Sequence, residues 1–192
     1  MPMRFTKATA LILVLLMGGP AFAQRSRRAS KEPDTGPVSV TRSATFQVAI
    51  AGDVASVFDY FADSHKLALW FPDQAIIEPQ LGGKYHFRWN GTEGVWSGLV
   101  TDFLRGNTIG FTWQPPGEPV ETQVRFKFSP QGGQTAIVLV HSGFTSSEAM
   151  DKAVKSWVFY LQNLKSVVEE GKDLRVAARF PAPRAAARRR KK

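Results

Sequence analysis

The chain has 192 residues, of which 43% are hydrophobic and 21% charged, a composition typical of one globular domain. It contains no cysteine, which excludes disulfide bonds, a thiol nucleophile, cysteine-ligated zinc and iron–sulfur clusters. The formal net charge is +9, but residues 38–174 carry 11 basic and 14 acidic side chains. The positive charge therefore belongs to the two ends of the chain, and we expect no specific binding of nucleic acid.

The N-terminal segment has the three parts of a secretory signal peptide, which we place at residues 1–23. Two basic residues precede a short apolar run from Ala8 to Met17, and Ala21-Phe22-Ala23 provides a cleavage site before Gln24. The alternative is a membrane anchor, but these ten apolar residues are too few to cross about 30 Å of hydrocarbon. We therefore expect a bacterial Sec-type signal, export to the periplasm or the medium, and a flexible linker at residues 24–37.

A first strand and two short helices are predicted next. Apolar residues alternate imperfectly from Val38 to Ile50, which indicates a strand. Asp53 can cap a short helix, and a second short helix from His65 to Phe71 is ended by Pro72. After these helices the hydrophobic period changes to two, which is typical of antiparallel strands with one buried face. Six such strands are expected at residues 75–78, 84–89, 95–104, 109–113, 120–128 and 135–141.

The longest predicted helix runs from about Ser146 to Glu170. Thr145 and Glu148 fit a capping box at its start, and Gly171 is the residue type that most easily ends a helix in the left-handed conformation. Apolar residues recur between them every three or four positions, so the helix has one long apolar face. Such a face needs a partner of similar size, and the preceding strands can supply it as one antiparallel sheet.

The C-terminal segment differs from the rest of the chain. Residues 174–192 are rich in Ala, Arg and Pro and have no apolar face, so we expect a disordered tail after a domain that spans residues 38–173. This tail is either a solvated end or an electrostatic attachment to an anionic membrane or lipopolysaccharide surface. Its basic run consists of Arg188, Arg189, Arg190, Lys191 and Lys192.

Several short motifs occur in a fixed order along residues 42–171. They are Trp70-Phe71-Pro72, Gly82 to Phe87, Gly94 to Leu99, Thr112-Trp113, Thr135 to Phe144, Trp157 and Leu164. Together with the order of elements, they resemble the START-like (SRPBCC, helix-grip) superfamily. Within it, the sequence is similar to the family related to the C-terminal domain of the activator of heat-shock protein 90 ATPase. The resemblance implies an α+β fold with a curved seven-stranded antiparallel sheet around a long C-terminal helix, and two short helices after the first strand.

The resemblance also implies a cavity between the sheet and the long helix, because members of this superfamily bind or turn over small apolar molecules. The cytosolic co-chaperone role is not carried over, since an exported protein would not meet an ATP-driven chaperone. Aromatic residues dominate the inward phase of the strands, which suits an apolar or ring-bearing ligand. The residues expected to bind it are Tyr85, Phe87, Trp89, Phe111, Trp113, Phe126, Phe128, Leu139, His141, Trp157 and Leu161.

Three functions stay open at this point. The first is an exported protein that binds an apolar small molecule, without a cofactor or a metal ion. The second is a cyclase or hydrolase-like enzyme that uses the same cavity, with His141 or Tyr85 as the group that transfers a proton. The third is a partner-binding module whose aromatic residues fill the core and leave no room for a ligand. The alternation of residues along the strands is compatible with more than one of these functions, because an inward side chain can fill a core or line a cavity.

Overall fold

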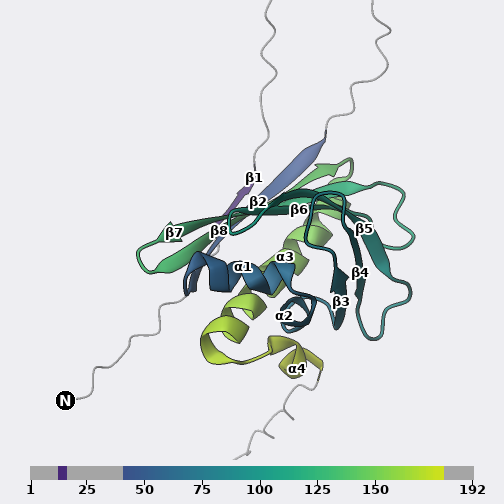
Figure 1. The fold of residues 1–192 in the computed structure, drawn as a ribbon. Helices are drawn as coiled ribbons and strands as arrows, with labels where there is room; N and C mark the ends of the chain where they lie inside the picture. Colours follow the sequence, from purple (N-terminus) through teal and green to yellow (C-terminus); the bar gives the residue numbers. More distant parts are fainter. Residues whose placement is uncertain (1–12, 17–40, 180–192) are drawn as a thin grey trace, which may run out of the picture.

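The structure, a computed structural model, describes residues 13–16 and 41–179 (Figure 1). It has the predicted α+β helix-grip architecture, in which a curved antiparallel sheet packs around one long helix. The strands are β1 (Leu13–Leu16), β2 (Arg42–Ala51), β3 (Gln74–Ile77), β4 (Lys84–Arg88), β5 (Trp96–Leu104), β6 (Thr108–Trp113), β7 (Thr122–Gln131) and β8 (Gln134–Phe144). The helices are α1 (Val54–Ala62), α2 (Ser64–Ala68), α3 (Ser147–Glu170) and α4 (Leu174–Arg179).

The sheet has the order β1-β2-β8-β7-β6-β5-β4-β3. Strands β2 to β8 are the seven predicted ones, and the described part of the chain adds β1 at the edge. Leu13 pairs with Gln47 and Leu16 with Ala44, so this short segment extends the ladder at the free edge of β2. We expected no strand there, because these residues lie within the predicted signal peptide. Cleavage of residues 1–23 stays a prediction.

The alternation of apolar and polar residues produces the buried face of the sheet. In β4, Tyr85 and Phe87 are fully buried, while Lys84, His86 and Arg88 are exposed on the other face. Position 98 in the sheet also requires a glycine. A Cβ atom at Gly98 in β5 would lie 2.2 Å from Thr112 Oγ1 and 2.7 Å from the Tyr85 ring, so only glycine allows this approach.

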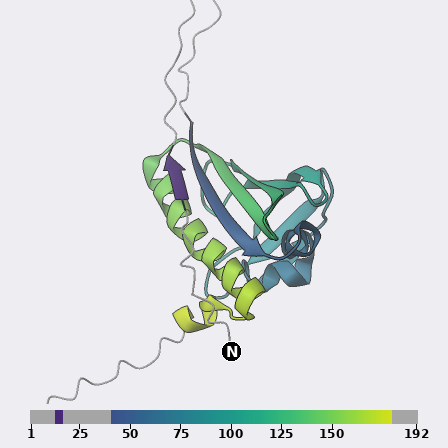
Figure 2. The ribbon, with the colours of Figure 1, turned by 90° about the vertical axis from the view of Figure 1, so that its left-hand side faces the viewer.

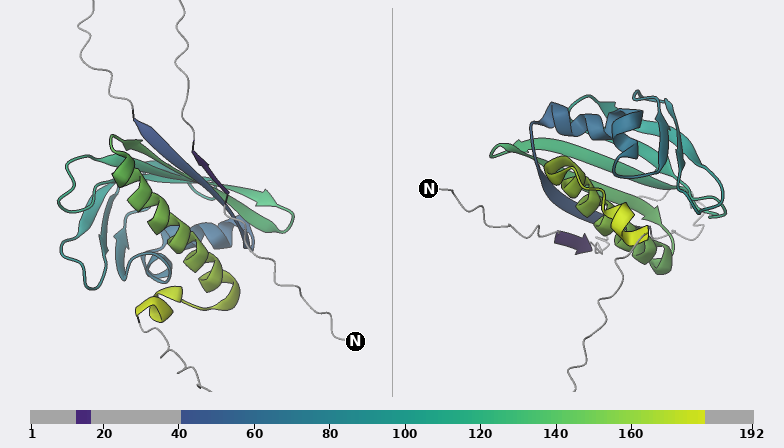
Figure 3. Two further views of the ribbon diagram at one scale, coloured as in Figure 1. Left: turned by 180° about the vertical axis from the view of Figure 1, so that it is seen from behind. Right: turned by 90° about the horizontal axis from the view of Figure 1, so that it is seen from below.

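Helix α3 begins and ends close to where the sequence predicts. The N-cap is Ser146 rather than Thr145, because the backbone of Ser146 is extended and its Oγ accepts a hydrogen bond from the N–H of Ala149 at 3.3 Å. The predicted stop at Gly171 is confirmed. Gly171 has φ 65°, which lets its N–H reach carbonyl groups of the last turn. Figures 2 and 3 show α3 lying across the concave side of the sheet and alongside β2.

The core fills most of the space between the sheet and the helices. Asp53 caps α1 as predicted, and α1 turns Val57, Phe58 and Phe61 toward the sheet. The Phe61 ring lies 4.8 Å from Phe126 and 4.9 Å from Phe128, with steep angles typical of aromatic packing. Because α1 fills this end of the concave face, little room is left there for a ligand.

Helix α4 corrects the prediction that the chain is disordered from residue 174. Arg175 is buried, and its guanidinium donates hydrogen bonds to the carbonyls of Ala68, Leu69 and Pro72 at 2.6–2.9 Å. Asp173 accepts from the same guanidinium at 2.8 Å. Composition could not reveal this role, because the composition of a segment does not show whether an arginine in it is buried or exposed. Residues 180–192, with the basic run from Arg188 to Lys192, lie outside the described residues, so their attachment to an anionic surface stays a prediction.

Candidate functional site

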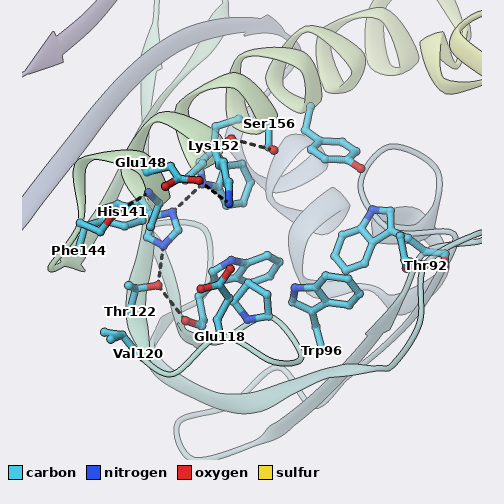
Figure 4. Close-up of a pocket in the computed structure, with 18 of the residues that line it drawn as sticks. Thr92, Trp96, Glu118, Val120, Thr122, His141, Phe144, Glu148, Lys152 and Ser156 are labelled. Atoms are coloured by element: carbon cyan, nitrogen blue, oxygen red, sulfur yellow. Dashed lines mark hydrogen bonds and ion pairs between the residues drawn. The ribbon is translucent and has the colours of Figure 1, made fainter.

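A cleft of about 600 Å³ opens between the sheet and the first half of α3 (Figure 4). Its walls come from the ends of strands, where loops meet the helix, and from one side of α3. This size lies in the range of small-molecule sites. The cleft is lined by Phe71, Trp89, Asn90, Thr92, Trp96, Trp113, Pro115, Glu118, Pro119, Val120, Thr122, His141, Phe144, Thr145, Ser146, Glu148, Ala149, Lys152, Ala153, Ser156, Trp157 and Tyr160.

Helical periodicity explains the α3 wall. Residues 149, 153 and 157 follow one another every four positions, as do residues 148, 152 and 156, so both rows lie on the same side of the helix. The second row is polar and the first is apolar, and the first ends in the buried indole of Trp157. The helix therefore gives the cleft an apolar inner wall and a polar rim.

Four of the eleven predicted ligand-binding residues line this cleft. They are Trp89, Trp113, His141 and Trp157. The other seven are fully or almost fully buried in the packed core and are not on the cleft wall, since α1 and the aromatic side chains occupy the space in front of them. These seven are Tyr85, Phe87, Phe111, Phe126, Phe128, Leu139 and Leu161.

Four aromatic residues of the cleft were missed as site residues: Phe71, Trp96, Phe144 and Tyr160. The second short helix was predicted to run to Phe71, but α2 ends at Ala68, so Phe71 lies in the irregular segment that follows it. The Trp70-Phe71-Pro72 motif did mark this segment. Its ring stacks on Trp157 with centroids 5.0 Å apart and meets Tyr160 edge to face at 5.0 Å. Phe71 thus forms the floor of the cleft.

The indole N–H groups of two wall residues are used within the protein. Trp89 Nε1 donates to the carbonyl of Phe71 at 3.1 Å, and Trp157 Nε1 donates to His141 Nδ1 at 2.9 Å. Both rings are held in place by these bonds. A ligand in the cleft therefore meets their π-faces and edges rather than their N–H donors.

His141 lies at the inner end of the cleft in a continuous chain of hydrogen bonds. Because Trp157 N–H donates to Nδ1, the ring proton is on Nε2, which donates to Thr122 Oγ1 at 2.8 Å. The Thr122 hydroxyl then donates to the carbonyl of Trp113 at 2.8 Å (Figure 4). Both ring nitrogens and the hydroxyl have partners, so the arrangement fixes a neutral imidazole.

Burial lowers the pKa of His141 to about 3. A proton on Nδ1 would also face the N–H of Trp157, which has no lone pair to accept it. His141 is therefore a poor general base in this structure. Tyr85, the other residue considered for proton transfer, is fully buried away from the cleft and donates to the carbonyl of Thr112 at 2.6 Å. Burial raises the pKa of its hydroxyl, so Tyr85 stays protonated.

Three charged side chains line the cleft. Lys152 and Glu148 are four residues apart on α3 and form an ion pair of 3.1 Å at the rim, where both are largely exposed. Glu118 lies on the loop between β6 and β7. Figure 4 shows its side chain reaching from this loop toward the cleft, below α3. Among the described residues no group of three His, Asp or Glu side chains is placed to hold a metal ion.

Residues 52–169 match the family described as Activator of Hsp90 ATPase homolog 1-like protein. The match covers more than half of the chain. The chain belongs to this family. The resemblance drawn from the short motifs is thereby confirmed. The described cleft residues all fall within the matched range, whereas Arg175 and α4 lie beyond it.

Solved structures with the same fold share little sequence with this family member. Protein MLL2253 from Mesorhizobium loti is 18% identical with a TM-score of 0.61, over 68% of this chain and 99% of that chain. CalU16 from Micromonospora echinospora is 17% identical with a TM-score of 0.61, over 88% and 92%. The Aha1 dimer from Colwellia psychrerythraea is 19% identical with a TM-score of 0.59, over 68% and 98%. No curated protein sequence matches the chain.

Proposed function

We propose that this protein binds an apolar, ring-bearing small molecule in the cleft beside the first half of α3. The family and the fold support a ligand-binding SRPBCC protein. The observation that carries the finer proposal is the aromatic surface of the cleft, because aromatic walls present large, rigid apolar area to a ligand. These walls are Phe71, Trp89, Trp96, Trp113, Phe144, Trp157 and Tyr160.

Binding has more support than catalysis in this cleft. The imidazole of His141 has both nitrogens engaged and a pKa of about 3, and Tyr85 is not on the cleft wall. Binding also has more support than a partner module with a filled core, since the packed aromatic core ends below the cleft. The core under the C-terminal half of α3 thus has a structural role, and the N-terminal half has the room for a ligand.

The neutral dye N-phenyl-1-naphthylamine is expected to bind and to change the tryptophan fluorescence of the protein. Replacing Ala153 with phenylalanine should weaken this binding at least tenfold, because Ala153 lies on the inner row of α3 and a larger side chain would occupy the cleft. The matched control is Ala55→Phe on the exposed side of α1, away from the cleft, which should bind as the native protein does. Equal binding by the two variants, with both folded by circular dichroism, would contradict the proposed site.

We also propose that the domain works outside the cytoplasm, with residues 1–23 removed. The support is the order of charge, apolar run and small residues in that segment. None of the helices in the described ranges, 13–16 and 41–179, is long and apolar enough to cross a membrane. N-terminal sequencing of protein from a periplasmic fraction should begin at Gln24. A sequence that begins at Met1 would refute cleavage.

A further inference from the structure

The cleft combines aromatic faces with a carboxylate, and we propose that its ligand is an organic cation, such as a quaternary ammonium group attached to an apolar body. This inference rests on the proposed function and adds the charge of the ligand to it. The two features have independent origins in the structure. The rings come from the residue after β4, from β5, from β6 and from α3, whereas the carboxylate comes from the loop after β6.

The arrangement of the aromatic rings in the cleft favours a cationic ligand. Trp89, Trp96, Trp113 and Tyr160 are each only partly buried, so part of every ring is open. Trp89 contacts the other three, with ring centroids 4.7 Å from Trp96, 6.1 Å from Trp113 and 6.4 Å from Tyr160. The ring planes meet at 68°, 87° and 56°, so the rings form walls at steep angles instead of a flat stack. Ring faces attract cations through their quadrupole, and tryptophan does so most strongly.

The charges on the cleft wall also favour a positively charged ligand. Lys152 is already paired with Glu148 at 3.1 Å, so these two cancel. Glu118 has no ion pair within the described part of the chain, which leaves the cleft with one unmatched negative charge. An anionic ligand would meet Glu118 and would have to compete with Glu148 for Lys152. A cationic ligand would meet both the carboxylate of Glu118 and the indole faces.

The test compares benzyltrimethylammonium with neopentylbenzene, its uncharged isostere in which carbon replaces nitrogen, and with the anion 4-phenylbutyrate. Affinities are measured by displacement of N-phenyl-1-naphthylamine at low and at physiological salt. We expect the cation to bind at least tenfold more tightly than the neutral isostere, and this ratio to fall as salt rises, because salt screens the attraction of Glu118.

Two variants locate the effect in the cleft. Glu118→Gln should weaken binding of the cation about threefold to fivefold without changing that of the neutral isostere. Trp96→Leu should lower the ratio of cation to isostere affinity about tenfold. The matched control is Glu93→Gln, which removes an exposed acid from the loop before β5 that is not on the cleft wall, and it should leave all affinities unchanged.

The outcomes separate this inference from the proposed function. If the dye binds but cation and isostere displace it equally, or if 4-phenylbutyrate binds most tightly, the cation proposal is overturned while ligand binding stands. If Glu93→Gln weakens the cation as much as Glu118→Gln does, the attraction comes from general surface charge and the proposal is again overturned. If even the dye does not bind, the proposed function falls together with the inference.

Discussion

A variant in which leucine replaces Arg175 is expected to have a free energy of unfolding about 3–5 kcal/mol lower than the native chain. The side chain of Arg175 is 9% exposed, and it connects α4 to the segment that follows α2. Its guanidinium binds the carbonyls of Ala68 and Leu69 at 2.9 Å each, and these carbonyls belong to the end of α2, where no helical partner is available.

Removing the guanidinium would leave several carbonyls without a hydrogen-bond donor and would take a nearby cation away from two carboxylates. The guanidinium lies 2.8 Å from Asp173 and 3.9 Å from Asp73, whose side chain is 8% exposed. Breaking such a buried network costs more than losing a surface pair, because the remaining carboxylate cannot recover its hydration. The carbonyl of Phe71 also accepts from Arg175, at 3.3 Å, and from the indole of Trp89, so the variant should weaken dye binding in the cleft as well.

Urea unfolding followed by tryptophan fluorescence measures this effect. The matched control is Lys172→Leu, an exposed residue of the same connection between α3 and α4, which should change stability by less than about 0.5 kcal/mol. A chain that ends at Arg179 should be as stable as the full chain, and a chain that ends at Gly171 should lose about as much as Arg175→Leu. If the chain that ends at Gly171 kept full stability, α4 would not contribute to stability and the interpretation of Arg175 would be wrong.

Lowering the pH from 7.5 to 5 should reduce the free energy of unfolding by about 2 kcal/mol through His141 alone. Burial lowers the pKa of this histidine from 6.5 to about 3, so between these values the unfolded chain binds a proton that the folded chain does not. The free energy of unfolding therefore rises with pH across this window. The contribution of the neutral His141 is fully present above about pH 6.5 and is lost as the pH falls toward 3. Its ring contacts come from Thr122, Trp157, Trp113 and Phe144, which carry no charge to offset protonation.

The comparison with a variant isolates this contribution. His141→Gln removes the titrating group, so its free energy of unfolding should be lower at pH 7.5 and should change much less between pH 7.5 and pH 5. His86→Gln is the control, because His86 lies on the exposed face of β4 with Ser97 as its partner, and this variant should keep the native pH dependence. Stopping at pH 5 keeps most carboxylates ionised. If the free energy of unfolding of His141→Gln still fell by about 2 kcal/mol between pH 7.5 and pH 5, another group would be responsible for the pH dependence.

The sequence alone determined the order of the elements from β2 to α3, since local periodicity encodes it. Period two in Lys84–Arg88 and period 3.6 in Ser147–Glu170 each produce one apolar face, and each of these faces needs a packing partner that buries it. The stop at Gly171 and the cap at Asp53 follow from backbone preferences of single residues. The family follows in the same way, because its motifs lie on these elements.

The tertiary structure decided which inward residues belong to a site. Phe126 and Trp113 both point inward from neighbouring strands, and no periodicity separates them. Phe126 is 1% exposed because Phe61 of α1 covers it, whereas Trp113 lies at the end of β6, beyond the reach of α1, and lines the cleft. The tertiary structure also decided the role of Arg175, which in the sequence resembles the other basic residues of the tail. Only the path of the chain after Gly171 brings its guanidinium to the carbonyls at the end of α2, because burial of a charge depends on partners that are about a hundred residues away in sequence.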